Sequence, residues 1–219
     1  MVLLIGLAGG VVLTTAAAAR RTDTAYARYL KRSHAADVLV SPTNRGLPDY
    51  YPALAKLPSV AEVAVAIGFQ GFAPGAGGAL APSGALANGF VVIAPGDSRL
   101  GHTVERPKVI EGRMSRSDHP NEAVADSALA GALHLRPGST LRFAVAPTAA
   151  SGADFSKARP MTVTVVGIVV SRDNVVPVNA LATTPTLLVS PGFAARFQDD
   201  YVAHSSYDGA YLRLKPGSS

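Results

Sequence analysis

The sequence of 219 residues is 48% hydrophobic and 16% charged, so it forms one domain or two small ones, and a wholly disordered chain is excluded. The absence of cysteine excludes a disulfide scaffold, a thiolate zinc site and a cysteine nucleophile. The net charge is +5, and the basic residues are scattered along the sequence rather than clustered. Together with only 6% aromatic residues and no tryptophan, this scatter argues against a nucleic-acid partner. A weak attraction to anionic membrane lipids stays open.

Residues 1–19 carry no charged side chain and predict a transmembrane helix. Nineteen helical residues rise about 28 Å, close to the ~30 Å thickness of the hydrocarbon core of a bilayer. The alternative is a cleaved signal peptide ending in the alanines at 16–19, but no basic residue precedes the apolar run. Gly6 and Gly10 form a G-x-x-x-G step, a weak indication of packing on other membrane helices.

Residues 20–34 predict a helical stalk that continues from the membrane helix. Ala25, Tyr26, Tyr29 and Leu30 recur at helical spacing, with basic residues between them. A separate short helix after a break is the alternative. Because those basic residues follow the apolar run, the positive-inside rule would place the rest of the chain in the cytoplasm; the rule compares both flanks, so we give it little weight here.

Residues 35–219 predict an α+β domain whose β-rich part, an insertion, covers about 105–170. Short strands and helices alternate, and a β-α-β-like unit opens the domain with a buried strand at 36–41. Residues 72–89 and 148–157 are expected to be a loop and a flexible insertion. The further elements expected are strands at 60–69, 90–94, 108–110, 122–125, 140–145, 161–170, 186–190 and 210–214, and helices at 48–57, 127–133 and 191–197.

Four positions in this domain have predicted structural roles. Asp126 is placed to cap the helix at 127–133. Gly112 suits a tight turn at the end of a strand, and Gly138 a turn between a helix and a strand. Gly167, inside a long β run, indicates a bulge or a close backbone approach.

The sequence predicts no catalytic, cofactor-binding or metal-binding residues. It contains no Walker A motif, and the glycine-rich residues 75–78 match no dinucleotide fingerprint. Residues 96–101, around Ser98, have one residue too many for a G-x-S-x-G nucleophile elbow. No H-E-x-x-H occurs. A folded metal site is conceivable around His102 and His119, but exposed loop histidines are the better interpretation; the acidic residues nearby are Glu105, Glu111 and Asp118.

The order of six short segments along the chain carries a family resemblance. They are A-R-R-T-D-T-A-Y at 19–26, A-D-V-L-V at 36–40, V-I-E-G-R-M at 109–114, N-E-A-V-A-D-S-A-L-A at 121–130, L-H-L-R-P-G-S-T-L at 133–141 and V-T-V-V-G-I-V at 163–169. In this order, nearly the whole chain resembles the first transmembrane helix and the extracytoplasmic MacB-like core domain of MacB/FtsX-type ABC transporter permeases, particularly actinobacterial forms.

The resemblance implies a non-enzymatic permease subunit in the cell membrane, with its main domain outside the cytoplasm. Its implied partners are a separate ABC ATPase subunit, other permease membrane helices or a second permease copy, and membrane lipid. A complete permease has further membrane helices, so we expect a fragment or a truncated product. The alternative is a secreted or singly anchored, non-enzymatic α+β binding domain.

Overall fold

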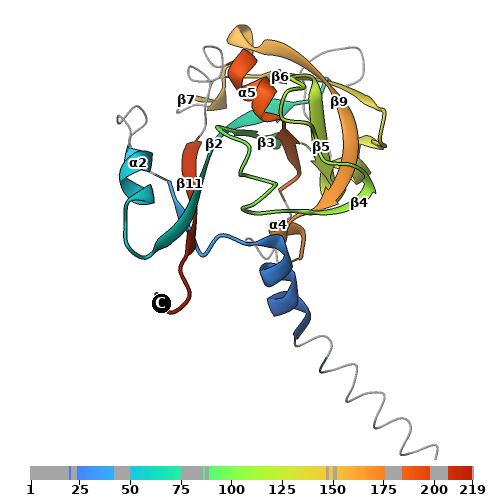
Figure 1. Cartoon of the computed structure of the whole chain (residues 1–219). Coiled ribbons are helices and arrows are strands. Elements are labelled where there is room, and N and C mark those ends of the chain that lie inside the picture. The colour runs from blue at the N-terminus through green and yellow to red at the C-terminus, as the bar shows by residue number, and fades with distance from the viewer. Residues whose placement is uncertain are drawn as a thin grey trace, which may run out of the picture.

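A computed structural model describes residues 20, 24–41, 50–74, 86, 89–146, 148–149, 152–175, 184–197 and 207–218. Residues 24–33 form a helix that leads into a mixed α/β domain with one large sheet (Figure 1). The strands are β1 (Val38–Val40), β2 (Val60–Phe72), β3 (Phe90–Pro95), β4 (Lys108–Gly112), β5 (Glu122–Asp126), β6 (Thr140–Val145), β7 (Thr148–Ala149), β8 (Gly152–Ala153), β9 (Arg159–Val170), β10 (Thr186–Val189) and β11 (Tyr207–Leu214). The helices are α2 (Tyr50–Ala55), α3 (Ser127–Leu133), α4 (Arg172–Val175), α5 (Pro191–Arg196) and a 3-10 turn (Phe155–Lys157).

The sheet follows the order β1-β11-β2-β3-β10-β5-β9-β4, and β6 pairs with both β2 and β9. These pairings close a ring through β2, β3, β10, β5, β9 and β6. Every strand of the ring contributes to one apolar core, in which Phe90 and Phe143 meet edge to face with ring centroids 5.7 Å apart. Leu129 of α3 and Phe193 of α5, both fully buried, extend this core beyond the ring.

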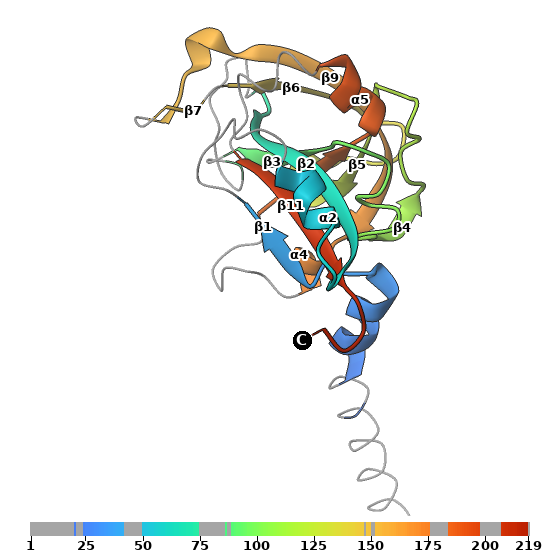
Figure 2. The same ribbon diagram turned by 60° about the vertical axis from the view of Figure 1, so that its left-hand side comes forward.

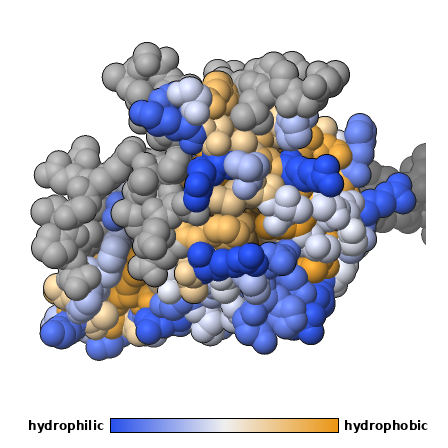
Figure 3. All heavy atoms as spheres, turned by 90° about the horizontal axis from the view of Figure 1, so that it is seen from above, coloured by the Kyte–Doolittle hydropathy of each residue, from blue (hydrophilic) through white to orange (hydrophobic). Residues whose placement is uncertain are grey.

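Two strands extend the sheet outside the ring on one side, and one on the other. β11 pairs with β2 and carries β1 on its far side, whereas β4 pairs with β9. Helix α2 packs on this outer part through Tyr51 and Leu54. Figure 3 shows the end of the molecule that is uppermost in Figure 1, where hydrophilic side chains surround a central band of apolar ones.

The predicted glycine roles are confirmed. Gly112 and Gly138 have φ of +70° and +96°, the left-handed region in which a side chain is strained. A Cβ on Gly167 would lie 2.1 Å from the carbonyl oxygen of Arg113, so the backbones of β9 and the segment after β4 approach closely. The pairing of β9 with β5 shifts register between Val165 and Gly167, and its pairing with β4 shifts register between Ile168 and Val169, so the ladder is irregular on both sides of the glycine, as predicted.

The predicted cap of α3 is also confirmed, and the helix ends in an unexpected way. The Asp126 carboxylate accepts a hydrogen bond of 2.7 Å from the Leu129 amide. At the other end His134 has φ of 53°, and the amide of Leu135 donates to the carbonyl of Ala130 at 2.9 Å. This is a Schellman cap with histidine in the position that usually holds glycine.

Some predicted elements were wrong in detail. The strand expected to be buried at 36–41 is a short edge strand, in which Val38 and Leu39 are exposed. It does not pair with β2, because the C-terminal strand β11 lies between them. β2 and β4 run further than expected, α4 was missed, and residues 148–157 include a β7–β8 hairpin and a 3-10 turn.

Several predictions fall wholly or partly outside the described residues. The transmembrane helix at 1–19 is one of them, and the stalk at 20–34 is described only at residue 20 and at 24–34. The loop at 72–89 is described only at 72–74, 86 and 89. Among the described residues, no helix combines the length and the apolar character needed to cross a bilayer.

Candidate functional site

The junction between the helix at 24–33 and the sheet is the most elaborate polar arrangement near the N-terminal part of the domain. The helix ends at Ser33, and His34 follows with φ of 48°. The amide of Ala35 donates to the carbonyl of Leu30 at 3.0 Å, so a second histidine forms a Schellman cap. The left-handed residue turns the chain sharply away from the helix axis and toward β1.

Hydrogen bonds from the loop before β4 hold the end of this helix. The amides of Arg106 and Glu105 donate to the carbonyls of Ser33 and His34, at 2.6 and 3.1 Å. These carbonyls belong to the last turn, where no intrahelical partner is available. One turn earlier, the Tyr29 hydroxyl donates to the carbonyl of Val170 at the end of β9, at 3.2 Å. The helix is therefore tied to two segments that are distant in sequence.

An ion pair clamps the backbone immediately after the helix. Glu105 accepts a hydrogen bond of 2.9 Å from the Ala36 amide, and Arg172 of α4 donates to the Ala36 carbonyl at 3.1 Å. Glu105 and Arg172 are themselves 3.1 Å apart, with side chains 15% and 30% exposed. Both polar groups of the Ala36 residue thus have charged partners, and those partners neutralise each other. We call Glu105, Arg172 and Ala36 the junction clamp.

Burial shapes the electrostatics of this junction. It raises the pKa of Glu105, against the opposing effects of the Ala36 amide and the Arg172 guanidinium. It also raises the pKa of Tyr29 to about 12, and the negative charges of Glu105 and Asp173 act in the same direction. The tyrosine is therefore a neutral hydrogen-bond donor at physiological pH.

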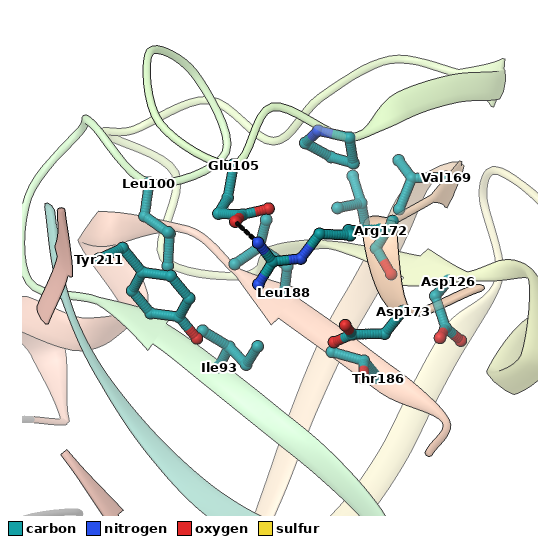
Figure 4. A pocket seen from close by; sticks show the side chains of 13 residues that line it. Ile93, Leu100, Glu105, Asp126, Val169, Arg172, Asp173, Thr186, Leu188 and Tyr211 are labelled. Atoms are coloured by element: carbon teal, nitrogen blue, oxygen red, sulfur yellow. Dashed lines mark ion pairs between the residues drawn. The ribbon is translucent and has the colours of Figure 1, made fainter. Parts of the chain in front are cut away.

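A pocket of about 90 Å³ opens beside the clamp (Figure 4). Apolar side chains such as Leu100 and Leu188 form part of its lining, and the polar lining residues are Glu105, Asp126, Ser171, Arg172, Asp173 and Thr186. The figure shows the Arg172 side chain reaching across the pocket to the Glu105 carboxylate. The ion pair of the clamp therefore forms part of the wall of this small pocket.

A second buried carboxylate lies in a different part of the domain. Glu122, which begins β5, receives two hydrogen bonds from the Arg113 guanidinium at 2.6 and 2.7 Å. Arg116 adds its backbone amide at 2.9 Å and its guanidinium at 3.1 Å. The bonds from Arg113 hold the pKa of Glu122 well below its usual range. This network fixes the loop between β4 and β5 rather than forming a cleft.

The sequence candidates for metal and nucleophile chemistry are not brought together. Glu105 belongs to the clamp, and His119 pairs with its neighbour Asp118 at 2.8 Å. Within the described residues, no group of three or more His, Cys, Asp or Glu side chains is arranged to hold a metal ion. Ser98 lies exposed on a bend after β3.

Sequence reasoning missed the junction clamp. Glu105 was considered only as a possible metal ligand, and Arg172 was not considered. No local pattern connects the two, because they meet only when the loop before β4 and the segment after β9 are folded against the start of β1.

Comparisons with known proteins found similarity to several solved structures. No protein-family model matches the sequence, and no curated protein matches it. The periplasmic region of MacB from Actinobacillus actinomycetemcomitans is similar over 76% of this chain, with 12% identity and a TM-score of 0.43. The chain spans 63% of the length of that MacB region.

Two further solved structures are similar to a comparable degree. The extracellular domain of the noncanonic ABC-type transporter YknZ from Gram-positive bacteria has 11% identity and a TM-score of 0.45, over 76% of this chain and 71% of that one. A domain of a permease protein from Porphyromonas gingivalis has 14% identity and a TM-score of 0.40, over 77% of this chain and 68% of that one. The similarity concerns the mixed α/β architecture.

Proposed function

We propose that this chain is a non-enzymatic part of a MacB/FtsX-type ABC transporter permease, consisting of a membrane anchor, a helical stalk and an extracytoplasmic domain. The ordered sequence segments between residues 19 and 169 support the family. The uncharged residues 1–19 support the anchor. Since the chain contains no Walker A motif, the ATP hydrolysis that drives such a system is assigned to a separate ATPase subunit.

The observation that carries the proposal is that the helix at 24–33 and the segment after β11 lie at the same end of the domain. The helix at 24–33 and the segment after β11 lie near each other in both views (Figures 1 and 2). Tyr26, Leu30 and Lys31 of the helix line one groove together with Leu214 and Lys215. A domain attached to a membrane through one face needs this arrangement, because every connection to the bilayer has to leave from that face.

The junction clamp supports the idea that the stalk moves with the domain. A helix joined to its domain by a single flexible peptide would rotate without displacing the sheet. Here Tyr29, Ser33, His34 and Ala36 all have hydrogen-bond partners on the loop before β4 or on the segment from β9 to α4. We propose that displacement of the stalk, caused by the partner ATPase, reaches the sheet through these bonds.

Cysteine labelling in intact cells tests the proposed location, and the chain has no native cysteine. Ser117 is exposed on the loop before β5, so Ser117→Cys should react with a membrane-impermeant maleimide before lysis. Ser115, two residues away but 4% exposed, supplies the matched control, because Ser115→Cys should react only after unfolding. Labelling of Ser117→Cys only after lysis would contradict an extracytoplasmic domain.

A further inference from the structure

Two left-handed residues meet where the helix at 24–33 joins the sheet. Apart from glycines, three residues in the described part of the chain have a positive φ: His34 at 48°, Glu105 at 50° and His134 at 53°. In the left-handed region the Cβ atom crowds the following carbonyl oxygen, so such residues are strained. The Glu105 amide donates to the His34 carbonyl at 3.1 Å. Two of the three strained residues are therefore hydrogen-bonded to each other.

The hydrogen bonds around these two residues form one connected set. The carbonyl of His34 accepts from Glu105, and its Nδ1 atom donates to the carbonyl of Thr103 at 3.1 Å. The carboxylate of Glu105 accepts from the Ala36 amide at 2.9 Å. The loop before β4 thus holds the chain at His34 and again at Ala36, with the amide and the side chain of a single residue.

The backbone conformation makes these hydrogen bonds depend on one another. The amides of Ala35 and Arg106 donate to carbonyls of the helix at 3.0 and 2.6 Å, and each directly follows a left-handed residue. If His34 or Glu105 left the left-handed region, the amide after it would turn away from its acceptor, and strain would be released in the same step. Breaking one bond therefore makes the next easier to break, which favours two states over gradual loosening.

We propose that this junction is a two-state hinge. The structure described above is the closed state. In the open state His34 and Glu105 leave the left-handed region, the junction clamp separates, and the helix at 24–33 moves away from the loop before β4 while the sheet stays folded. One consequence rests on the proposed function: the closed junction passes displacement of the stalk to the sheet, whereas the open junction does not.

Native-state hydrogen exchange of the full chain in detergent micelles tests whether the junction opens as one unit. The amides of Ala35, Ala36, Glu105 and Arg106 should be equally protected, within about twofold, and at least about tenfold less than the Val165 amide, which lies fully buried in β9. Four unequal values would mean that the bonds open one by one. Protection equal to that of Val165 would mean that the junction opens only when the domain unfolds. Either result would overturn the hinge.

Arg172→Ala perturbs one end of the hinge and leaves the other end to report. It removes the charged partner of the Ala36 carbonyl, so exchange at the Ala36 amide should accelerate about tenfold. Exchange at the Arg106 amide, which donates to Ser33, should accelerate by the same factor. Acceleration confined to Ala36 would contradict a two-state hinge. Unchanged exchange at Val165 verifies that the domain remains folded.

Arg196→Ala is the matched control for the Arg172 variant. It also removes an arginine that donates a hydrogen bond, in this case to Asn121, but it lies in helix α5 outside the junction. Exchange at the four junction amides should be the same as in wild type. Equal acceleration in Arg172→Ala and Arg196→Ala would mean that the effect is not specific to the hinge.

Substitutions at His34 measure the strain directly. His34→Ala and His34→Gly both remove the bond to Thr103, but only glycine adopts the left-handed conformation without strain. The four junction amides should exchange about fivefold more slowly in His34→Gly than in His34→Ala, a factor that corresponds to ~1 kcal/mol. Equal exchange in the two variants would show that no strain is stored, and the hinge proposal would be wrong.

The second histidine cap supplies the matched comparison. His134→Ala and His134→Gly make the same change at the end of α3, so they should differ at the Leu135 amide and leave the junction amides unchanged. None of these measurements requires transport. The hinge can therefore fail while the proposed function stands, and labelling of Ser117→Cys can contradict the proposed location while the hinge stands.

Discussion

Replacing Glu105 by alanine should loosen the junction clamp at one identifiable amide. The Ala36 residue is 7% exposed, and its amide hydrogen bond to Glu105 would have no replacement. A buried donor without a partner costs about 1–3 kcal/mol. Arg172 would also lose its ion-pair partner, but its side chain is 30% exposed, so water limits that additional cost to about 0–1 kcal/mol. A local loss of about 2 kcal/mol corresponds to a roughly 30-fold change in an equilibrium constant.

Hydrogen exchange of the full chain measures this effect directly. We expect the Ala36 amide to exchange about 30-fold faster in Glu105→Ala, following the ~2 kcal/mol local loss. Glu105→Gln keeps an acceptor oxygen and removes only the charge, so it should give a smaller increase. The Leu129 amide, which donates to the Asp126 carboxylate, is the chemically matched control and should not change. Unchanged exchange at Ala36 in Glu105→Ala would refute the clamp.

Three further predictions concern the glycines, Glu122 and the stalk. Gly167→Ala should destabilise the domain by about 2–4 kcal/mol in urea unfolding, because the new Cβ would meet the Arg113 carbonyl. Gly131→Ala in helix α3 should stabilise the domain by about 0.5–1 kcal/mol, because a Cβ there meets nothing within 4 Å. Destabilisation by both changes would contradict this prediction. The pKa of Glu122 is lowered in the folded state, so Glu122 stabilises the fold above the ordinary carboxylate pKa of about 4.3, and this stabilisation is lost as the pH falls below that value. Glu122→Gln should therefore unfold at a lower urea concentration than wild type at pH 7, and the difference between the two midpoints should narrow in acid. A difference in midpoint that does not change with pH would refute the reasoning. Ala27→Pro should break the stalk helix at a local cost of ~3 kcal/mol and abolish transport by the complete transporter while the partner ATPase remains bound; unimpaired transport would rule out a rigid stalk.

Local signals in the sequence predicted the parts of the fold that depend on neighbouring residues. Asp126 could be identified as a cap because the capped amide lies only three residues further along the chain. Gly112 and Gly167 could be identified because β patterning stops or is interrupted there, and Gly138 because it follows a proline between a helix and a strand. The cap and the glycine turns depend on residues close to them in the sequence, so they could be predicted without knowing the order of the strands in the sheet.

The candidate site could not be predicted in the same way. The clamp joins Ala36, Glu105 and Arg172, and only the order of strands brings these residues together. The strand at 36–41 was expected to be buried because its residues are apolar, but hydrophobicity does not reveal that a strand lies at an edge. His34 was expected to be the last residue of the stalk, and His134 directly follows the helix expected at 127–133. Their role in ending helices depends on backbone conformation, which the residue type alone does not indicate.

The position of β11 between β1 and β2 has a consequence for how the domain is made. During synthesis β1 and β2 emerge early, but the strand that lies between them is among the last parts of the described chain to be translated. Until then the edge of β2 that pairs with β11 offers unpaired backbone groups over most of a long strand. The nascent chain therefore carries an unpaired strand edge, able to pair with other chains, for most of its synthesis. The sheet is completed only late, when the distant strand β11 pairs with β2 and β1. Binding of a chaperone to that edge would protect it until β11 arrives.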